Sequence, residues 1–292
     1  MRIVHTAVEL AEIEPAGSGK KHGRRAVVMT MGALHEGHLA LVRAAREAAD
    51  QVVVTVFVNP LQFDDDADLE RYPRDLDADA ALLEPLGVDV VYAPSVEDVY
   101  PGGAPIVTVS AGTINDVFEG EHRPGHFDGV LTVVLKLMHL TRPDVAYFGQ
   151  KDAQQVIAIR TMCRDLNVPV DIVAVPTVRD ADGLALSSRN VQLSQADRAD
   201  ALVLSRALAE AEEVLAEGGP LSLALTVARA AFAEVPTVTP DYIGAMDPVS
   251  AVAVEGDYRG DVVIAVAARV GGTRLIDNVI ARVGPREGVA DA

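Results

Sequence analysis

Residues 26–38 read AVVMTMGALHEGH. The apolar run Ala26–Met31 is typical of a buried strand, and Gly37–Ala49 places apolar residues at helical spacing. We therefore expect a strand to pass directly into a helix here, with His35 and His38 at the junction. A strand followed at once by a helix is the first half of a βαβ unit, from which parallel α/β sheets are built.

The rest of the first half repeats this alternation. Further strands are predicted at Gln51–Val58, Val88–Ala93, Val107–Val109, Val145–Phe148 and Val170–Val178. Helices are predicted at Gly129–Leu140 and Ala153–Leu166, and residues 64–79 are predicted to be an acidic loop that gives way to a helix carrying Leu82 and Leu83. The fold class is therefore α/β, a Rossmann-like doubly wound parallel sheet, whose ligand crevice lies outside the carboxyl ends of its strands.

The composition changes after Asn190. Helices are predicted at Ser194–Glu217 and Leu221–Glu234, and strands at Asp241–Met246, Val262–Val270 and Leu275–Ile280. This pattern favours a second, smaller α+β domain at the C-terminal end. We expect a first domain over residues 1–176 and a second over residues 177–292.

The composition limits the possible functions. The formal net charge of −18, from 25 basic and 43 acidic residues, disfavours a general nucleic-acid binder, which needs a basic face. Cys163 is the only cysteine, so no disulfide forms within the chain, and a reducing cytoplasmic setting fits best. Neither a signal peptide nor an apolar segment of membrane-spanning length is predicted, so we expect no membrane partner.

The two histidines can hold a phosphate. The first turn of a helix favours anions through its backbone N–H groups and its dipole, and imidazoles can donate to phosphate oxygens. An isolated pair three residues apart would more often be two incidental surface histidines or a metal pair. The strand, Gly32 and Gly37 around His35 and His38 favour the phosphate interpretation, since glycine lets a ligand approach the backbone.

Residues 31–38 resemble the H-x-G-H signature of the class I aminoacyl-tRNA synthetase and nucleotidylyltransferase superfamily, and residues 30–38 are similar to pantothenate synthetases in particular. Residues 57–63 (FVNPLQF), 148–155 (FGQKDAQQ) and 187–190 (SSRN) extend the match in family order over essentially the whole chain. The resemblance implies an enzyme that condenses pantoate with β-alanine through a pantoyl-adenylate. It also implies ATP as substrate, Mg²⁺ held mainly by the ATP phosphates, and a homodimer. No protein ligand of Mg²⁺ is assigned, although Asp152 could help to order the ion or accept from a ribose hydroxyl.

The resemblance also implies roles for single residues. Catalytic roles fall to His38, His35 and Lys151. ATP contacts fall to Met31, Gly32, Ala33, Leu34, His35, Glu36, Gly37, His38, Gly149, Gln150, Lys151, Asp152, Val178, Leu186, Ser187, Ser188 and Arg189. Contacts to pantoate or β-alanine fall to Gln62, Gln155 and Asn59, and the stretch with Glu119, Arg123 and His126 is similar to a family segment near the pantoate pocket.

Each of these residues has a simpler interpretation. Neighbouring Lys151 and Asp152 can be a surface ion pair, SSRN can be a turn or helix cap, and Gln62 and Gln155 can be buried structural residues. The chain also departs from the family pattern at Met29 (usually proline), Gln150 (glutamate), Ala153 (tyrosine) and Leu186 (methionine). None of these departures removes a cation or an imidazole.

Two rival functions remain open at this point. A simple nucleotidylyltransferase would transfer AMP to a phosphorylated acceptor and stop, and a nucleotide-binding regulator would bind ATP without turnover. Product analysis with ATP, pantoate and β-alanine separates them. In the ligase, we expect the segment 64–79 to act as a lid over the reactive adenylate.

Overall fold

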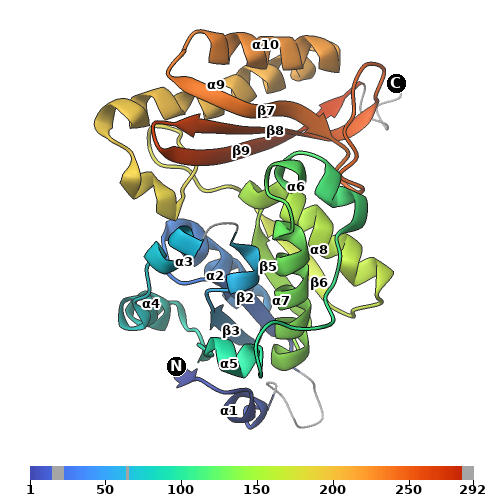
Figure 1. The fold of residues 1–292 in the computed structure, drawn as a ribbon. Coiled ribbons are helices and arrows are strands. Elements are labelled where there is room, and N and C mark those ends of the chain that lie inside the picture. Colours follow the sequence, from blue (N-terminus) through green and yellow to red (C-terminus); the bar gives the residue numbers. More distant parts are fainter. Residues whose placement is uncertain (15–22, 64–65, 285–292) are drawn as a thin grey trace. The chain divides into compact units, whose positions relative to one another are not determined.

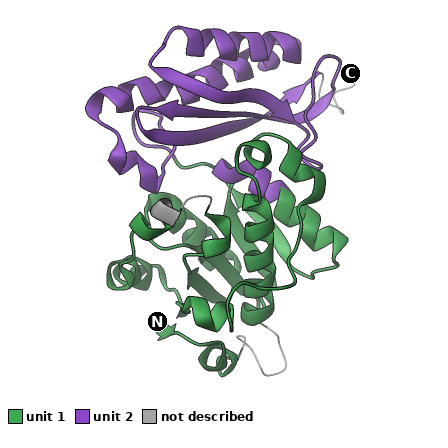
Figure 2. Ribbon diagram, viewed as in Figure 1, with its two compact units in different colours: residues 1–150, 158–178 green, residues 151–157, 179–292 purple. Residues whose placement is uncertain are grey.

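The computed structural model describes residues 1–14, 23–63 and 66–284. The chain forms two compact units (Figure 2). Unit 1 comprises Met1–Gln150 and Ala158–Val178, and unit 2 comprises Lys151–Ile157 and Arg179–Ala292. The domain boundary expected between residues 176 and 177 stays a prediction. Within the described residues, no helix is both long enough and apolar enough to cross a lipid bilayer.

The large sheet belongs to unit 1, and all its strands are parallel (Figure 1). Its strands run in the order β1-β4-β3-β2-β5-β6. They are β1 (Arg2–Val4), β2 (Arg25–Thr30), β3 (Gln51–Val56), β4 (Val90–Tyr92), β5 (Val145–Gly149) and β6 (Asp171–Val175). This is the doubly wound parallel arrangement that the alternation of strands and helices predicts.

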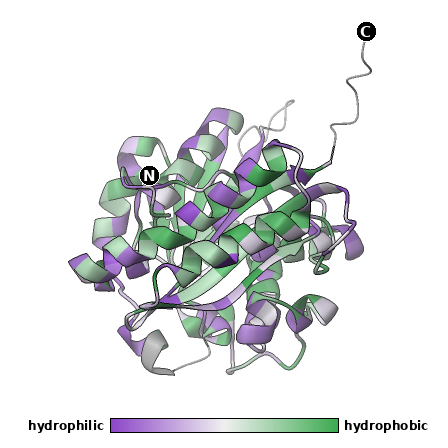
Figure 3. Ribbon diagram, turned by 90° about the horizontal axis from the view of Figure 1, so that it is seen from above, coloured by the Kyte–Doolittle hydropathy of each residue, from purple (hydrophilic) through white to green (hydrophobic). Residues whose placement is uncertain are grey.

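Helices and short 3-10 turns connect these strands. The helices are α1 (Ala7–Ala11), α2 (Glu36–Ala48), α3 (Asp66–Arg71), α4 (Leu76–Leu83), α5 (Val96–Val99), α6 (Glu119–His122), α7 (His126–Thr141) and α8 (Ala153–Asp165). The 3-10 turns are η1 (Pro60–Gln62), η2 (Glu84–Leu86), η3 (Gly112–Asp116) and η4 (Gln150–Asp152). The helices carry hydrophobic and hydrophilic residues in alternation along their length (Figure 3), as helices with one buried face do.

The winding of the sheet reverses at β2. The chain proceeds from β2 to β3 and β4 on one side, and β5 pairs with β2 on the other side. In such sheets the ligand crevice forms where the strand order reverses, at the carboxyl ends of the two central strands. The ends of β2 and β5 carry residues 31–38 and Gly149-Gln150, so the motifs found in the sequence lie at the switch point.

The centre of this sheet is apolar on both faces. Val27, Val53 and Val54 have no exposed surface, and Leu41 and Val42 of α2 belong to one buried cluster with Val54. Continuous apolar strands of this kind are expected where both faces of a parallel sheet are covered. Cys163 is buried too, and burial raises the pKa of its thiol to about 11, as expected of a core residue.

Unit 2 contains an antiparallel sheet in the order β7-β8-β9, together with two long helices. Its elements are η5 (Ser188–Gln192), α9 (Gln195–Ala216), α10 (Leu221–Ala233), β7 (Val238–Met246), β8 (Gly260–Val270) and β9 (Thr273–Val283). Ser194 caps α9 by accepting from the Asp197 N–H at 3.1 Å, as the sequence predicts. The smaller α+β C-terminal part is thus confirmed.

Three local expectations differ from the structure. No strand forms at Val107–Val109: Val107 is exposed, and the Val109 N–H donates to the Thr132 hydroxyl, not to a neighbouring strand. The described part of residues 64–79 is helical at α3 and at the start of α4, while residues 64–65 lie outside the described residues. The short strand β1 was not predicted, since its three residues are too few to show a period.

Candidate active site

The turn between β2 and α2 needs an unusual backbone. Gly32 and Ala33 have φ angles of +83° and +52°, in the left-handed region. Asp79 of α4 holds this turn, because its carboxylate accepts from the Ala33 N–H at 3.1 Å and from the Leu34 N–H at 2.8 Å. A Cβ on Gly32 would lie 2.9 Å from the Asp79 Oδ2 atom, so glycine is required both for its φ angle and for the space.

Asp79 is almost fully buried, with 3% of its surface exposed. Burial raises the pKa of this carboxyl, and the hydrogen bonds from Leu34 and Ala33 oppose that shift. No local pattern marks Asp79 as a site residue, since it lies 45 positions from Leu34 in an acidic stretch.

His35 and His38 cap the helix that they begin. His35 is the N-cap of α2, and its Nδ1 atom accepts from the Gly37 N–H at 3.2 Å. His38 reaches back, and its Nδ1 atom accepts from the His35 N–H at 3.3 Å. The two ring centroids are 4.1 Å apart. This is a reciprocal capping box built from two imidazoles.

The caps determine which nitrogen of each ring carries the proton. A neutral imidazole has one N–H, and a ring whose Nδ1 atom accepts a hydrogen bond carries that proton on Nε2. In its neutral form, each ring therefore carries its proton on Nε2. Glu36, between them, is half-exposed and accepts from Arg43 on the surface of α2.

A second polar group of unit 1 surrounds η1. Asn59, with 1% exposure, donates from Nδ2 to the Gln62 Oε1 atom at 3.1 Å and to the Gly129 carbonyl at 3.2 Å. Its Oδ1 atom accepts from the Tyr100 hydroxyl at 2.9 Å. Gln62 in turn donates from Nε2 to the Met31 sulfur at 3.1 Å, which joins η1 to residues 31–38.

Arg123, at the end of α6, and His126, at the start of α7, complete this group. Arg123 donates to the Gln62 carbonyl at 3.2 Å, and the His126 Nδ1 atom lies 2.9 Å from the same oxygen. The Arg123 Nη1 and His126 Nε2 atoms are 3.1 Å apart. Since a guanidinium only donates, His126 accepts there and donates through Nδ1. Glu119, from the same stretch of sequence, is buried in α6.

Unit 1 also contains Gly149, Gln150 and Val178. Gly149 ends β5, Gln150 begins η4, and Val178 follows β6. Tyr100 was not predicted from the sequence. Its ring is buried against Phe57, and burial raises the pKa of its hydroxyl, so it remains a neutral donor to Asn59.

The remaining predicted residues belong to unit 2. Lys151 is half-buried, Asp152 is exposed and Gln155 is half-buried on α8. Ser187 caps η5, since its hydroxyl accepts from the Arg189 N–H at 3.2 Å. Leu186, Ser188 and Arg189 are all partly exposed on the same segment.

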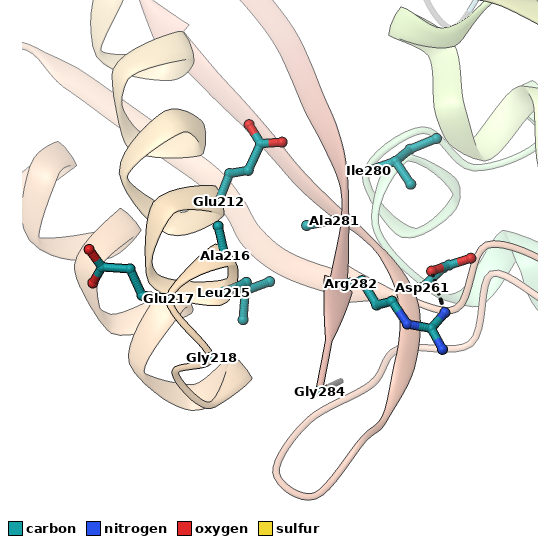
Figure 4. A pocket seen from close by; sticks show the side chains of 10 residues that line it. All are labelled: Glu212, Leu215, Ala216, Glu217, Gly218, Asp261, Ile280, Ala281, Arg282 and Gly284. Atoms are coloured by element: carbon teal, nitrogen blue, oxygen red, sulfur yellow. Dashed lines mark hydrogen bonds and ion pairs between the residues drawn. The ribbon is translucent and has the colours of Figure 1, made fainter. Parts of the chain in front are cut away.

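Unit 2 also contains a pocket that is separate from the predicted site residues (Figure 4). It has a volume of about 910 Å³ and contains none of the predicted site residues. Its lining includes Glu212 of α9, Glu217 at the C-cap of that helix, and the ion pair between Asp261 and Arg282. We assign no role in the reaction to it.

Comparisons with known proteins identify the family. Residues 2–280 match the model of the family described as pantoate-beta-alanine ligase. This chain belongs to that family. A pantothenate synthetase of Thermobifida fusca is 52% identical over 95% of this chain and 94% of its own length.

Solved structures of pantoate–β-alanine ligases agree with the fold. A pantothenate synthetase of Thermus thermophilus is 47% identical, with a TM-score of 0.88 over 98% of this chain and 100% of that chain. A pantoate–β-alanine ligase of Francisella tularensis is 34% identical, with a TM-score of 0.76 over 96% of this chain and 97% of that chain. The latter was solved in complex with "Beta-gamma ATP" and β-alanine.

Proposed function

We propose that this chain condenses pantoate with β-alanine in two steps at the expense of ATP. The pantoate carboxylate attacks the α-phosphate, which gives pantoyl-adenylate and pyrophosphate. The β-alanine amine then attacks the mixed anhydride, which gives pantothenate and AMP. The match of residues 2–280 to the ligase family carries this proposal, and the geometry at the ends of β2 and β5 supports it.

His35 and His38 bind the ATP phosphates in this proposal. Because Nδ1 accepts the cap hydrogen bond on each ring, Nε2 is the nitrogen that donates when the ring is neutral. Donors that are already fixed stabilise the charge of the five-coordinate phosphorus without reorganising during the reaction. Residues 31–38, Gly149 and Gln150 supply the surrounding ATP contacts, and Val178 meets the adenine through its backbone.

Lys151 supplies the mobile cation of the site. An ammonium on a flexible stem can follow the phosphate charge as it moves toward the leaving pyrophosphate. Residues 186–189 hold the β- and γ-phosphates with two hydroxyls and a guanidinium. We assign this role to them because Ser187 is fixed as a cap, which orders the segment.

Gln62 and Gln155 bind pantoate. A neutral amide can hold a carboxylate oxygen without neutralising a nucleophile that must stay anionic. Asn59 serves pantoate chiefly by orienting Gln62, because its amide bonds to Gln62, Gly129 and Tyr100. Arg123 and His126 fix the Gln62 backbone from the other side.

Magnesium accompanies ATP in this proposal. Across residues 1–14, 23–63 and 66–284, no group of three or more His, Cys, Asp or Glu side chains could hold a metal ion. Mg²⁺ in nucleotide sites usually takes one or two carboxylates and completes its shell with phosphate oxygens and water. Asp152 is the carboxylate beside Lys151 that fits this need, and the bound ion would supply neutralisation of phosphate charge.

The second step depends mainly on proximity. Holding the adenylate and the amine in reacting geometry can supply about 7–11 kcal/mol of the barrier. The adenylate must also be kept from water, and we assign this lid function to the described residues that precede α4, 66–75. Asp79 itself stays bound to the β2–α2 turn. We place the reaction in the cytoplasm, because a chain with Cys163 as its single cysteine needs no oxidising compartment.

We also propose that the chain is a homodimer, as the family resemblance implies. Ile106 and Val107 support this, because both side chains are largely exposed in the stretch 106–109, which reads IVTV. Such β-branched residues favour strand pairing.

The proposed function is tested by mixing enzyme with ATP, magnesium and pantoate alone. We expect one pyrophosphate per active site, followed by AMP release in many turnovers once β-alanine is added. Release of ADP and phosphate would indicate an acyl-phosphate route and overturn the mechanism. Binding of ATP without any turnover would favour a regulator, and transfer of AMP to a phosphorylated acceptor would favour a simple nucleotidylyltransferase.

A further inference from the structure

Two neighbouring residues of β9 contact both ATP-binding segments of unit 2. The Asn278 amide donates from Nδ2 to the carbonyl oxygen of Lys151 at 2.8 Å. The Asp277 carboxylate accepts from the two terminal nitrogens of Arg179 at 2.6 and 2.9 Å. Asp277 and Asn278 are 3% and 5% exposed, whereas the Arg179 side chain is 32% exposed, so the β9 end of each bond is buried.

The Arg179 contact fixes the base of the loop that ends in residues 186–189. Arg179 forms an isolated antiparallel bridge with Ala185, and its Nη1 atom also donates to the Gly183 carbonyl at 3.2 Å. Asn190 closes the far side by donating to the Ala185 carbonyl at 3.0 Å. The loop is therefore a closed turn. Among the described residues, Asp277 is the carboxylate that pairs with Arg179 at its base.

The Asn278 contact fixes the main chain of Lys151. Lys151 lies in the short turn η4, and residues 151–157 belong to unit 2 (Figure 2). A further bond stiffens the pair, because the Asp277 Oδ1 atom also accepts from the Asn278 N–H at 2.8 Å. One strand thus fixes the lysine and the loop in a common frame.

We propose that Asn278 and Asp277 are positioning residues for the first step, Asn278 for Lys151 and Asp277 for the loop 179–190. The inference rests on the proposed function, in which Lys151 and residues 186–189 bind ATP. A lysine has a long flexible side chain, so the position of its main chain decides where its ammonium can reach. A misplacement of about 1 Å can cost a factor of about 100 in rate.

The two residues predict different kinetic effects. Asn278→Ala leaves the carbonyl of Lys151 unanchored, so we expect a fall of roughly 10- to 100-fold in pyrophosphate release at saturating ATP. Asp277→Asn removes the two-pronged acceptor of Arg179 and loosens the phosphate loop, so we expect the KM for ATP to rise more than kcat falls. Arg179→Lys keeps the positive charge but loses the two parallel N–H donors of the guanidinium, so it should also raise the KM for ATP.

A double-mutant cycle decides whether Asn278 acts through Lys151. In a Lys151→Ala background the ammonium is gone, so Asn278→Ala should cause no further loss of single-turnover rate. Rates are normalised to the folded fraction, and Asn278→Ser provides a second, polar variant if the alanine variant is unstable. Arg282→Ala is the matched control, because Arg282 lies on the same strand and pairs with Asp261, and its rate should equal that of the parent.

Additive losses in the double mutant, or parental rates in Asn278→Ala, would overturn the inference. The inference would also be overturned if kcat fell in Asn278→Ala, Asp277→Asn and Arg179→Lys in proportion to the decrease in melting temperature of each variant. That result would indicate a structural role alone. Failure of the proposed function looks different, since the parent itself would then release no pyrophosphate from ATP and pantoate.

Discussion

Single residues of the β2–α2 turn cap the helix and, in the proposed function, also bind the ligand. Serine, threonine and aspartate are the usual caps of helices, but here His35 and His38 accept the N-terminal N–H groups. The same bonds determine the tautomer and hold each ring in place. The structural and the functional interpretations of the two histidines therefore do not exclude each other.

His38→Ala should lower adenylation by about 10²–10⁴-fold, the usual contribution of one acid–base or electrostatic side chain. It also removes half of the capping box, so we expect a loss of about 1 kcal/mol in the free energy of unfolding. His38→Gln separates the two effects, because glutamine at this position can restore the cap. Single-turnover pyrophosphate release and the melting temperature are measured on the same samples.

The His38→Gln variant should be as stable as the parent and still slow. Parental adenylation in this variant would show that the imidazole does no chemistry. If the variant were unstable but released pyrophosphate at the normal rate per folded molecule, the role of His38 would be limited to capping the helix.

Asp79 predicts a pH dependence of stability. Its pKa in the folded protein lies above the ordinary value of 3.8, chiefly because burial disfavours the charged form. The stability that Asp79 contributes is therefore full below this ordinary value and is lost as the pH rises through the raised pKa. Asp79→Asn abolishes the titration and keeps an oxygen that can accept from Leu34.

As the pH rises above the ordinary pKa of 3.8, the free energy of unfolding of the parent should fall relative to that of Asp79→Asn. Urea unfolding of both proteins at several pH values measures this difference. A difference that stays constant with pH would show that the Asp79 pKa is the same in the folded and unfolded states.

At the scale of elements, the pantoate end of the proposed site depends on a helix that approaches a turn unusually closely. A Cβ built on Gly129 of α7 would lie 2.1 Å from the Leu61 carbonyl oxygen of η1. Only glycine allows this approach, and it brings the Gly129 carbonyl to Asn59. The position of Gln62 is thus set by the packing of α7.

Gly129→Ala should push η1 away from α7. Overpacking of this kind typically costs about 1–3 kcal/mol of stability. Because η1 carries Gln62 and is capped by Asn59, the KM for pantoate should rise as well. Gly272→Ala is the control, since no atom lies within 4 Å of its added Cβ. Chemical denaturation measures the loss of stability, and steady-state kinetics with varied pantoate concentration measures the KM. An unchanged KM for pantoate would show that η1 does not contribute to pantoate binding.

Most elements were predictable because their patterns are local. The period of α9, its cap Ser194 and the apolar strands β2, β3 and β5 all appear within short windows of sequence. Val107–Val109 shows the limit of such windows. It has the composition of a strand, but a strand also needs a partner, and the described residues offer it only the Thr132 hydroxyl.

At the scale of the whole molecule, that segment predicts the oligomeric state. If a second copy covers Ile106 and Val107, replacing both with lysine should convert the dimer to a monomer, because the charges would be buried without partners. Analytical ultracentrifugation of the parent and of the Ile106→Lys, Val107→Lys double variant measures this. Val249→Lys is the control, since Val249 is also exposed. A double variant that remains dimeric would place the interface elsewhere.

The sequence alone determined the family, the α/β class and the residue types of the proposed site, because motif, period and cap are properties of neighbouring residues. The tertiary structure alone decided what holds those residues in place. Asp79 reaches Leu34 across 45 positions and Asn278 reaches Lys151 across 127, and no local pattern specifies either pairing. Buried donors and acceptors must find partners wherever the fold brings them, so the supporting contacts appear only once the chain is folded.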